Sequence, residues 1–179
     1  MRTIKIISIV VLSTFSLLAC KSAKDKTGEK ISLLEKELIS ATAKIDSTKA
    51  QQLIDLYVSY ANQYKEDSIS PLYLFKAADI SMNIMKPLQS ISLLDRIMID
   101  YHSFSKLPDC LFLKAFIYEN QIHELDKATK TYNDFLQKYP NNEFAPSAKA
   151  SVENIGIPAE ALIKSFEAKN KISSDSIKP

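Results

Sequence analysis

The sequence predicts an all-α fold, an α-solenoid of about eight antiparallel helices that form hairpins with a period of 37–38 residues. Three observations lead to this prediction. Tyr64, Tyr101 and Tyr139 are 37 and 38 residues apart, and each is followed seven residues later by a proline. Between these positions, apolar residues recur at the spacing of one helical face. No segment shows sustained alternation of apolar and polar residues, so no β-strand is expected.

The expected helices follow one another with short connections. They span residues 30–45, 48–64, 70–85, 87–101, 107–122, 125–139, 145–155 and 157–169. Prolines open most of the later helices, as expected for the first helical position, where a missing N–H costs no hydrogen bond. These prolines are Pro71, Pro87, Pro108, Pro146 and Pro158. Gly156 fits the position just after a helix, where only glycine enters the left-handed region cheaply.

Helices 48–64 and 125–139 each carry a single apolar stripe. The first stripe is Leu53, Leu56, Tyr57, Tyr60, Ala61 and Tyr64, and the second is Ala128, Tyr132, Phe135, Leu136 and Tyr139. Thr48 and Gln51 have the spacing of a capping box at the start of the first of these helices.

The two helices of a pair are expected to differ in burial. Helices 70–85 and 107–122 are apolar nearly all round, so each needs cover on more than one side. Their partners, 87–101 and 125–139, carry one polar face. These partners are therefore predicted to form the outer layer.

Residues 1–19 have the pattern of a secretory signal peptide. Arg2 and Lys5 form a positively charged start, and an apolar stretch of 13 residues follows. As a helix this stretch is about 20 Å long, too short for a bilayer core of about 30 Å. It ends in Leu17-Leu18-Ala19-Cys20, which resembles the bacterial lipobox. The resemblance implies cleavage before Cys20 and lipidation of that cysteine; an ordinary cleaved signal with an incidental cysteine is the alternative.

The predicted organisation therefore has four parts. They are the lipoprotein signal peptide 1–19, the lipidated Cys20 with a flexible tether over 20–29, a helical domain over 30–169, and a disordered tail over 170–179. By analogy with enterobacterial sorting, the absence of Asp after the lipidated cysteine favours the outer membrane.

The composition excludes several classes of function. Two glycines cannot supply a Walker loop, a dinucleotide-binding G-x-G-x-x-G or a G-x-S-x-G elbow, and two histidines with two cysteines leave little for zinc. The net charge is +2, and residues 1–19 carry two basic residues and no acidic one. The mature chain is therefore neutral and offers no electrostatic footprint for nucleic acid.

The sequence holds no convincing catalytic or metal-binding group. Glu119 and His123 would share one face of a continuous helix, but a catalytic zinc needs three protein ligands and His102 is the remaining histidine. Cys110 lies in an apolar segment and is expected to be a buried, inert thiol. We therefore expect no metal, no cofactor and no enzymatic activity.

Residues 127–141, with Ala128, Tyr132, Phe135 and a closing Pro140, resemble the second helix of a tetratricopeptide repeat (TPR). Ala115 and Tyr118 fit the small and aromatic positions of the first helix. The period exceeds the usual value of about 34 residues, and Ser90 and His102 replace the expected Ala and Pro one repeat earlier. With its lipobox, the chain is similar to the TPR lipoprotein of the β-barrel assembly machine and to the TPR partner of the Tol–Pal system.

This resemblance implies a concave groove lined by the first helices of the pairs. The groove residues would be Asp79, Met82, Asn83, Phe116, Glu119 and Asn120. A wall that mixes apolar and hydrogen-bonding groups suits an extended peptide or a partner helix.

We therefore expect a membrane-anchored periplasmic lipoprotein that acts as a scaffold for other envelope proteins, in outer-membrane assembly or envelope maintenance. The alternative is a small-ligand or peptide-binding carrier on a lipid anchor. The expected location is the outer membrane, facing the periplasm, with the inner membrane and the cell surface left open. The sequence names no individual partner.

Overall fold

A computed structural model describes residues 22–40, 46–158, 160–164 and 167. Every regular element in these ranges is a helix, which confirms the all-α prediction. The elements are α2 (Ala23–Ser40), α3 (Ser47–Gln63), α4 (Ser70–Asn83), α5 (Pro87–Asp100), α6 (Leu107–Ile117), the π-helix η2 (Tyr118–Ile122), α7 (Leu125–Lys138) and α8 (Ala145–Asn154). The predicted signal peptide 1–19, Cys20 and the predicted tail 170–179 lie outside the described residues.

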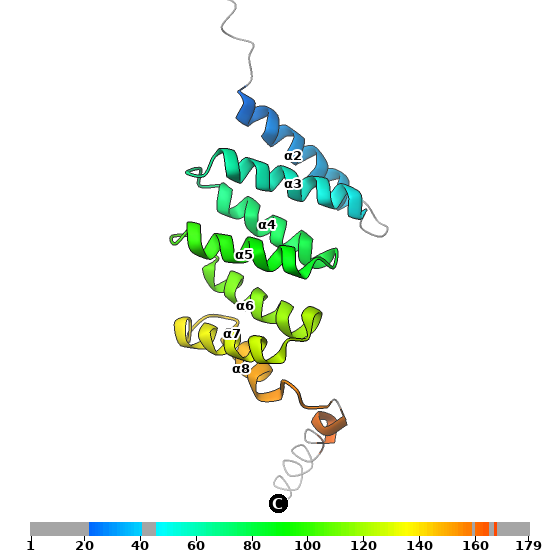
Figure 1. Ribbon diagram of the computed structural model, residues 1–179, viewed down its shortest axis with the longest axis vertical. Coiled ribbons are helices and arrows are strands. Elements are labelled where there is room, and N and C mark those ends of the chain that lie inside the picture. Colours follow the sequence, from blue (N-terminus) through cyan, green and yellow to red (C-terminus); the bar gives the residue numbers. More distant parts are fainter. Residues whose placement is uncertain (1–21, 41–45, 159, 165–166, 168–179) are drawn as a thin grey trace, which may run out of the picture.

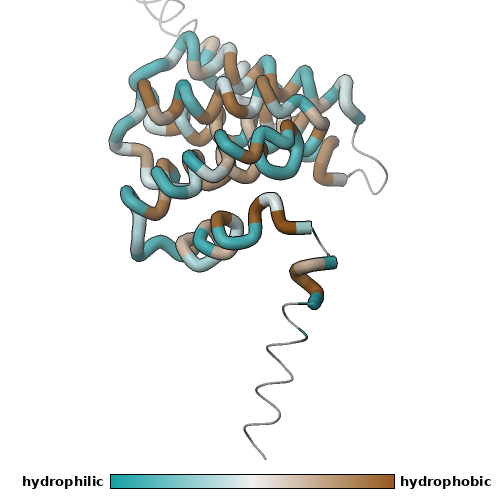
Figure 2. The backbone as a smooth tube through the Cα atoms, turned by 60° about the horizontal axis from the view of Figure 1, so that its bottom comes forward, coloured by the Kyte–Doolittle hydropathy of each residue, from teal (hydrophilic) through white to brown (hydrophobic). Residues whose placement is uncertain are grey.

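The helices are stacked in chain order, with consecutive helices antiparallel (Figure 1). α2 lies at one end of the stack and α8 near the other. The main packing contacts join helices that are neighbours in the chain. Hydrophobic and hydrophilic positions intermingle along each helix (Figure 2), as expected for helices that bury one face and expose another.

The sequence period corresponds to a repeated backbone conformation. Tyr64, Tyr101 and Tyr139 are the C-cap residues of α3, α5 and α7, with φ of −124°, −130° and −132° and ψ of 58°, 63° and 54°. Each tyrosine N–H donates to the carbonyl four residues earlier. The tyrosines therefore end the second helix of each pair in the same way.

The turns that follow these tyrosines also repeat. The carbonyls of Tyr64, Tyr101 and Tyr139 accept hydrogen bonds of 3.0, 3.0 and 3.1 Å from the N–H groups three residues later. The next helix then begins with a proline at its first or second position in each case. Since proline lacks an N–H, it fits the start of a helix, where that group has no intrahelical partner.

Buried side chains between neighbouring helices form the core. Leu53, Tyr57, Leu74, Leu94 and Ile97 belong to one cluster that extends from α2 to α6. A second cluster joins α6, α7 and α8.

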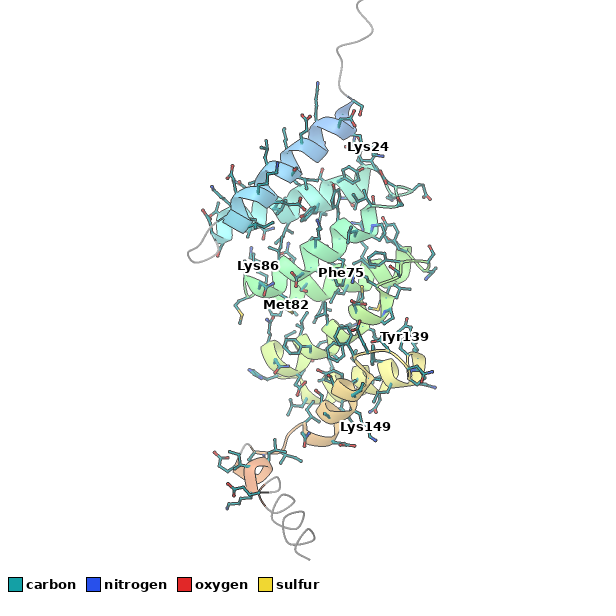
Figure 3. All side chains as sticks on the ribbon, turned by 180° about the vertical axis from the view of Figure 1, so that it is seen from behind. Lys24, Phe75, Met82, Lys86, Tyr139 and Lys149 are labelled. Atoms are coloured by element: carbon teal, nitrogen blue, oxygen red, sulfur yellow. The ribbon has the colours of Figure 1, made fainter. Side chains whose placement is uncertain are left out.

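The ring of Phe112 lies at the centre of the second cluster. Its centroid is 5.7 Å from that of Tyr132, 5.6 Å from that of Phe135 and 4.8 Å from that of Phe144. Aromatic contacts at such distances add to the stabilisation from buried area. Phe75, one repeat earlier on α4 (Figure 3), lies 6.3 Å from the ring of Phe104.

Two residues singled out in the sequence, Cys110 and Ser90, both lie in the core. Cys110 is fully buried, and burial raises the pKa of its thiol to about 12, so the reactive thiolate is disfavoured. Ser90 replaces the expected small apolar residue and is also buried. Its hydroxyl donates a 2.7 Å hydrogen bond to the carbonyl of Ala78, which joins α5 to α4.

The N-terminal helix begins earlier than predicted. The sequence interpretation placed a tether over 20–29, but α2 starts at Ala23. Ser22 and Asp25 cap this end: the Asp25 N–H donates to Ser22 Oγ at 3.1 Å, and the Ser22 N–H donates to Asp25 Oδ2 at 3.2 Å. This reciprocal pair resembles a capping box with Asp in the third position, and it makes residues 23–29 helical.

Other helix boundaries differ by smaller amounts. The N-cap of α3 is Asp46, whose side chain accepts from the N–H groups of Thr48 and Lys49, so the capping box predicted for Thr48 and Gln51 is wrong. The left-handed Gly156, with φ of 80°, follows α8 as predicted. Residues 160–164 are helical, and the rest of the predicted helix 157–169 lies partly outside the described residues.

The packing predicts that two leucines contribute very differently to the free energy of unfolding. Leu94 is 0% exposed between α4 and α6, whereas Leu33 on α2 is 62% exposed. We expect Leu94→Ala to lower the free energy of unfolding by about 2–5 kcal/mol, because it leaves a cavity. The control Leu33→Ala is expected to change it by less than about 0.5 kcal/mol. Urea unfolding followed by circular dichroism measures both, and equal effects would contradict the helix register.

Candidate protein-binding groove

A groove of about 370 Å³ lies between α2 and α4, and residues of α3 form its floor. Its apolar residues come from all three helices and are Leu38, Ile39, Ala50, Leu53 and Ile80. Ala50 and Leu53 are buried and form the floor, while Ile39 is highly exposed at the rim. We call this surface the α2–α4 groove.

Three polar side chains link the helices along one wall of the groove. Tyr57 on α3 donates its hydroxyl to Glu35 Oε1 on α2 at 2.5 Å. Lys76 on α4 donates to the same oxygen at 2.7 Å. One carboxylate therefore holds together the three helices that form the groove.

The protonation states of this cluster follow from its contacts. Burial raises the pKa of Glu35, but the hydrogen bonds from Lys76 and Tyr57 outweigh it, so the net pKa lies below the ordinary value. Burial and the hydrogen bond to Glu35 raise the pKa of Tyr57 well above its ordinary value. At neutral pH, Glu35 is therefore an anion neutralised by Lys76, and the Tyr57 phenol keeps its proton.

Asp79 is the second carboxylate of the groove and lies at its exposed rim. Its surroundings raise its pKa by desolvation, and a hydrogen bond with Asn83 partly opposes this effect. In the described part of the chain, Asp79 takes part in no salt bridge; the nearby Lys76 pairs with Glu35 instead. An anion without a cation beside an apolar floor favours a ligand that brings a positive charge.

A second polar cluster fixes the other end of α2. Lys24 forms an ion pair with Asp67 in the α3–α4 turn, and Tyr60 donates its hydroxyl to the same carboxylate at 2.7 Å. The N–H of Ile69 donates to Asp67 Oδ1 at 3.1 Å. The hydrogen bonds from Lys24, Tyr60 and Ile69 lower the pKa of Asp67 to about 2.

The six residues predicted to line one groove do not lie together in this one. Asp79 and Asn83 line the α2–α4 groove. Met82 is half-buried and packs against the core, and its carbonyl accepts a 3.1 Å hydrogen bond from Gln121 Nε2. This bond joins the end of α4 to η2. The groove therefore lies one repeat nearer the N-terminus than the predicted wall of 70–85 and 107–122.

The remaining three predicted residues lie one repeat later. Phe116 is 38% exposed and Asn120 is exposed, with its amide donating to the Phe116 carbonyl at 3.1 Å. Glu119 is half-buried and accepts a 2.8 Å hydrogen bond from the Tyr132 hydroxyl on α7. Glu119 therefore joins η2 to α7 and is not a free groove carboxylate.

Glu119 and His123 do not lie on one continuous helix, as the sequence interpretation assumed. Glu119 lies in η2, where its carboxylate accepts a hydrogen bond from Tyr132, and His123 is the residue that follows η2. His123 then ends the segment in the left-handed region, with φ of 59°. Within the described residues, no three His, Cys, Asp or Glu side chains are grouped so that they could hold a metal ion.

A larger hollow of about 980 Å³ lies between the α3–α4 and α5–α6 turns. Charged residues from both turns line it, including Lys65, Glu66, Asp100 and Lys106. Leu72 and Phe104 also contribute apolar surface, so the lining of this hollow is evenly mixed, whereas the lining of the α2–α4 groove is mostly apolar. The α2–α4 groove combines an apolar floor with fixed charges and is the better candidate.

Sequence comparison adds no family assignment. No model of a known protein family matches the chain, and no curated protein matches it at a significant level. Among the helices that the structure describes, none is both long and apolar enough to cross a membrane.

Sequence reasoning identified two groove residues and missed the others. Tyr57 was assigned to the core stripe, and no local pattern connects Glu35 with Lys76, which is 41 residues away. Their meeting depends on α2 packing beside α3 and α4.

The start of α2 had a local signal in the sequence: the spacing of Ser22 and Asp25 is that of a capping pair and could have placed this helix start correctly.

The Asp67 cluster predicts acid sensitivity. A carboxyl whose pKa is lowered on folding stabilises the fold above its unfolded pKa of about 3.9, and this stabilisation is lost as the pH falls. With a folded pKa of about 2, Asp67 should lose its contribution between roughly pH 4 and pH 2.

Asp67→Asn tests this expectation. In urea unfolding, the free energy of unfolding of the wild type should exceed that of the variant at pH 7, and the difference between them should shrink toward pH 2. A difference that stays constant across this range would contradict the assigned role of Asp67.

Proposed function

We propose that this chain is a lipid-anchored, TPR-like α-solenoid of the bacterial cell envelope that binds a segment of another envelope protein in the α2–α4 groove. The bound segment would carry apolar side chains and a basic residue. In this proposal the protein is a scaffold without catalytic activity.

The observation that carries the proposal is the combination of an apolar floor with Asp79. Leu38, Ile39 and Ile80, which are exposed or half-buried, offer contact area to apolar side chains of a partner. Asp79 lacks a cation in the described residues, so a Lys or Arg of the partner would supply one and fix the position of the segment. Apolar anchors supply most of the affinity at such interfaces, and charges supply specificity.

The position of the start of α2 determines how far a lipid on Cys20 would lie from the groove. Lys21 and Ser22 alone separate Cys20 from the first residue of α2. A lipid on Cys20 would therefore hold the helical stack close to the bilayer surface. Glu35 is 12 residues beyond Ala23, so the groove would lie about 18 Å along α2 from the end that carries the anchor.

The assignment to the envelope rests on the sequence of the N-terminus. The charged start, the short apolar stretch and the lipobox-like end together support export and lipidation. A residue other than Asp after Cys20 supports the outer membrane, with the domain facing the periplasm.

A small-ligand carrier is the second candidate function. The volume of the α2–α4 groove, about 370 Å³, falls within the usual range of small-molecule sites. A small cationic ligand with an apolar body would use the same floor and the same carboxylate.

Lipid anchoring predicts a change in membrane attachment. The Cys20→Ser variant of the full chain cannot be acylated at that position. We expect metabolic labelling with a fatty acid to mark the wild type and not the variant. We also expect cleaved Cys20→Ser protein to leave the membrane fraction in carbonate without detergent. Equal labelling of both proteins, or cleaved variant that stays on the membrane, would contradict the anchor.

Groove binding predicts a specific set of cross-links. A photo-reactive amino acid in place of Asn83 should cross-link to one or a few envelope proteins, and the same group at Lys149 on α8 should not give these products. The adducts should map to a segment with apolar residues and a Lys or Arg.

Binding of that mapped segment as a synthetic peptide then tests the charge. We expect Asp79→Lys to weaken binding by at least tenfold in fluorescence anisotropy, and the exposed, charge-matched control Glu143→Lys to leave it unchanged. Equal binding by both variants would contradict the role of Asp79. A purified protein that carries a small molecule displaced by Asp79→Lys would favour the carrier function instead.

A further inference from the structure

The outer face of α5 exposes two large apolar side chains on a regular helix. Leu88 is 73% exposed and Ile99 is 68% exposed. Ser92 and Asp95 lie between them. At about 100° per residue, the four side chains fall on one narrow stripe that covers three helical turns. We call this the α5 stripe.

Two copies of the α5 stripe match each other when they are placed antiparallel in one particular register. The midpoint between Leu88 and Ile99 in the sequence is also the midpoint between Ser92 and Asp95. Two copies of the helix, antiparallel about that midpoint, place each Leu88 opposite an Ile99 and each Ser92 opposite an Asp95. A two-fold interface requires such a self-complementary surface.

The contacts made at this stripe are favourable in both pairs. Leu88 and Ile99 would remove apolar surface from water at each end of the contact. In the middle, the Ser92 hydroxyl can donate a hydrogen bond to the Asp95 carboxylate of the other copy.

The charges at the stripe are already balanced within one chain. Asp95 accepts a 2.6 Å hydrogen bond from Lys114 on α6, and Arg96 lies 3.4 Å from Asp100. Bringing two copies together therefore does not place unpaired like charges against each other. A shallow surface hollow of about 490 Å³ over these residues leaves room for the side chains of a second helix.

We propose that two copies of the chain associate through the α5 stripe, with their α5 helices antiparallel about a two-fold axis. None of the stripe residues lines the α2–α4 groove. The dimer therefore leaves both grooves free, and this inference does not depend on the proposed function.

Disulfide cross-linking of the full chain in membranes tests the orientation. Two chains with different tags are produced together, one with Leu88→Cys and the other with Ile99→Cys. Because opposed residues bring their Cβ atoms to about 4 Å, mild oxidation should give the mixed disulfide dimer. Each variant alone should give at least tenfold less dimer, since antiparallel packing keeps identical positions at the stripe ends apart.

Further variants make the result specific. The wild-type chain and Lys149→Cys, on α8 at the far end of the stack (Figure 3), should give no oxidation-dependent dimer above background. Ser92→Cys and Asp95→Cys, produced together on differently tagged chains, should give a mixed dimer, because these positions are opposed in this register. Adding Leu88→Asp to both chains should lower that yield at least tenfold, with an unchanged helical circular dichroism spectrum.

Opposite outcomes overturn the proposal. A dimer from Leu88→Cys alone that matches the mixed dimer would show parallel or random contact. Equal cross-linking at Lys149→Cys, or no loss of dimer with Leu88→Asp, would place any association elsewhere on the molecule.

Discussion

Each internal helix of this stack is stabilised mainly by the helix before it and the helix after it. Because the main contacts join chain neighbours, an internal helix must bury two faces, and small residues allow the close approach that this needs. Ala77 and Ala78 on α4, Ala115 on α6 and Ala128 on α7 are all buried to at least 99%. The large side chains, such as Tyr57, Leu94 and Tyr132, then fill the space between these contacts. The nearly all-round apolar character of 70–85 and 107–122 follows from the same constraint.

The sequence was sufficient to predict the helices because the same local signals recur along it. Tyr64, Tyr101 and Tyr139 mark helix ends, and the proline seven residues later marks the next start, since both act through local backbone geometry. The start of α2 and the π-helix η2 were not predicted. The first depends on a capping pair with Asp where Glu is usual, and the second changes the register inside an apolar run that otherwise looks continuous.

The groove could be predicted only in part, because its walls come from helices whose relative placement has no local signal. The repeat relates Asp79, Met82 and Asn83 to Phe116, Glu119 and Asn120, so the pattern suggests two equivalent surfaces. The surroundings differ, however. Tyr132 binds Glu119, and Gln121 bonds to Met82, whereas Asp79 and Asn83 face α2 across an open groove.

The position of the groove at the N-terminal end has a physical cause. α2 is the first described helix, and its main contact is with α3 alone. Ile31 is the one fully buried side chain among those described in α2. Leu34 and Leu38 also pack against the core, and two polar clusters add to the attachment: Asp67 with Lys24 near the start of α2, and Glu35 with Lys76 and Tyr57 farther along. Because α2 packs mainly on α3, an apolar strip beside α4 stays uncovered.

This arrangement couples the docking of α2 to the occupation of the groove. Glu35 belongs both to the cluster that attaches α2 and to the lining of the groove, and Leu38 and Ile39 on the same helix form its rim. A ligand that contacts this rim binds the docked form of α2 and not the detached form. By linkage, it stabilises the docked helix by an amount set by its concentration relative to its dissociation constant. By the same reciprocity, any change that loosens α2, including protonation of Asp67, would weaken the proposed binding in the groove, although Asp67 contacts α2 near its start and the groove lies toward its end.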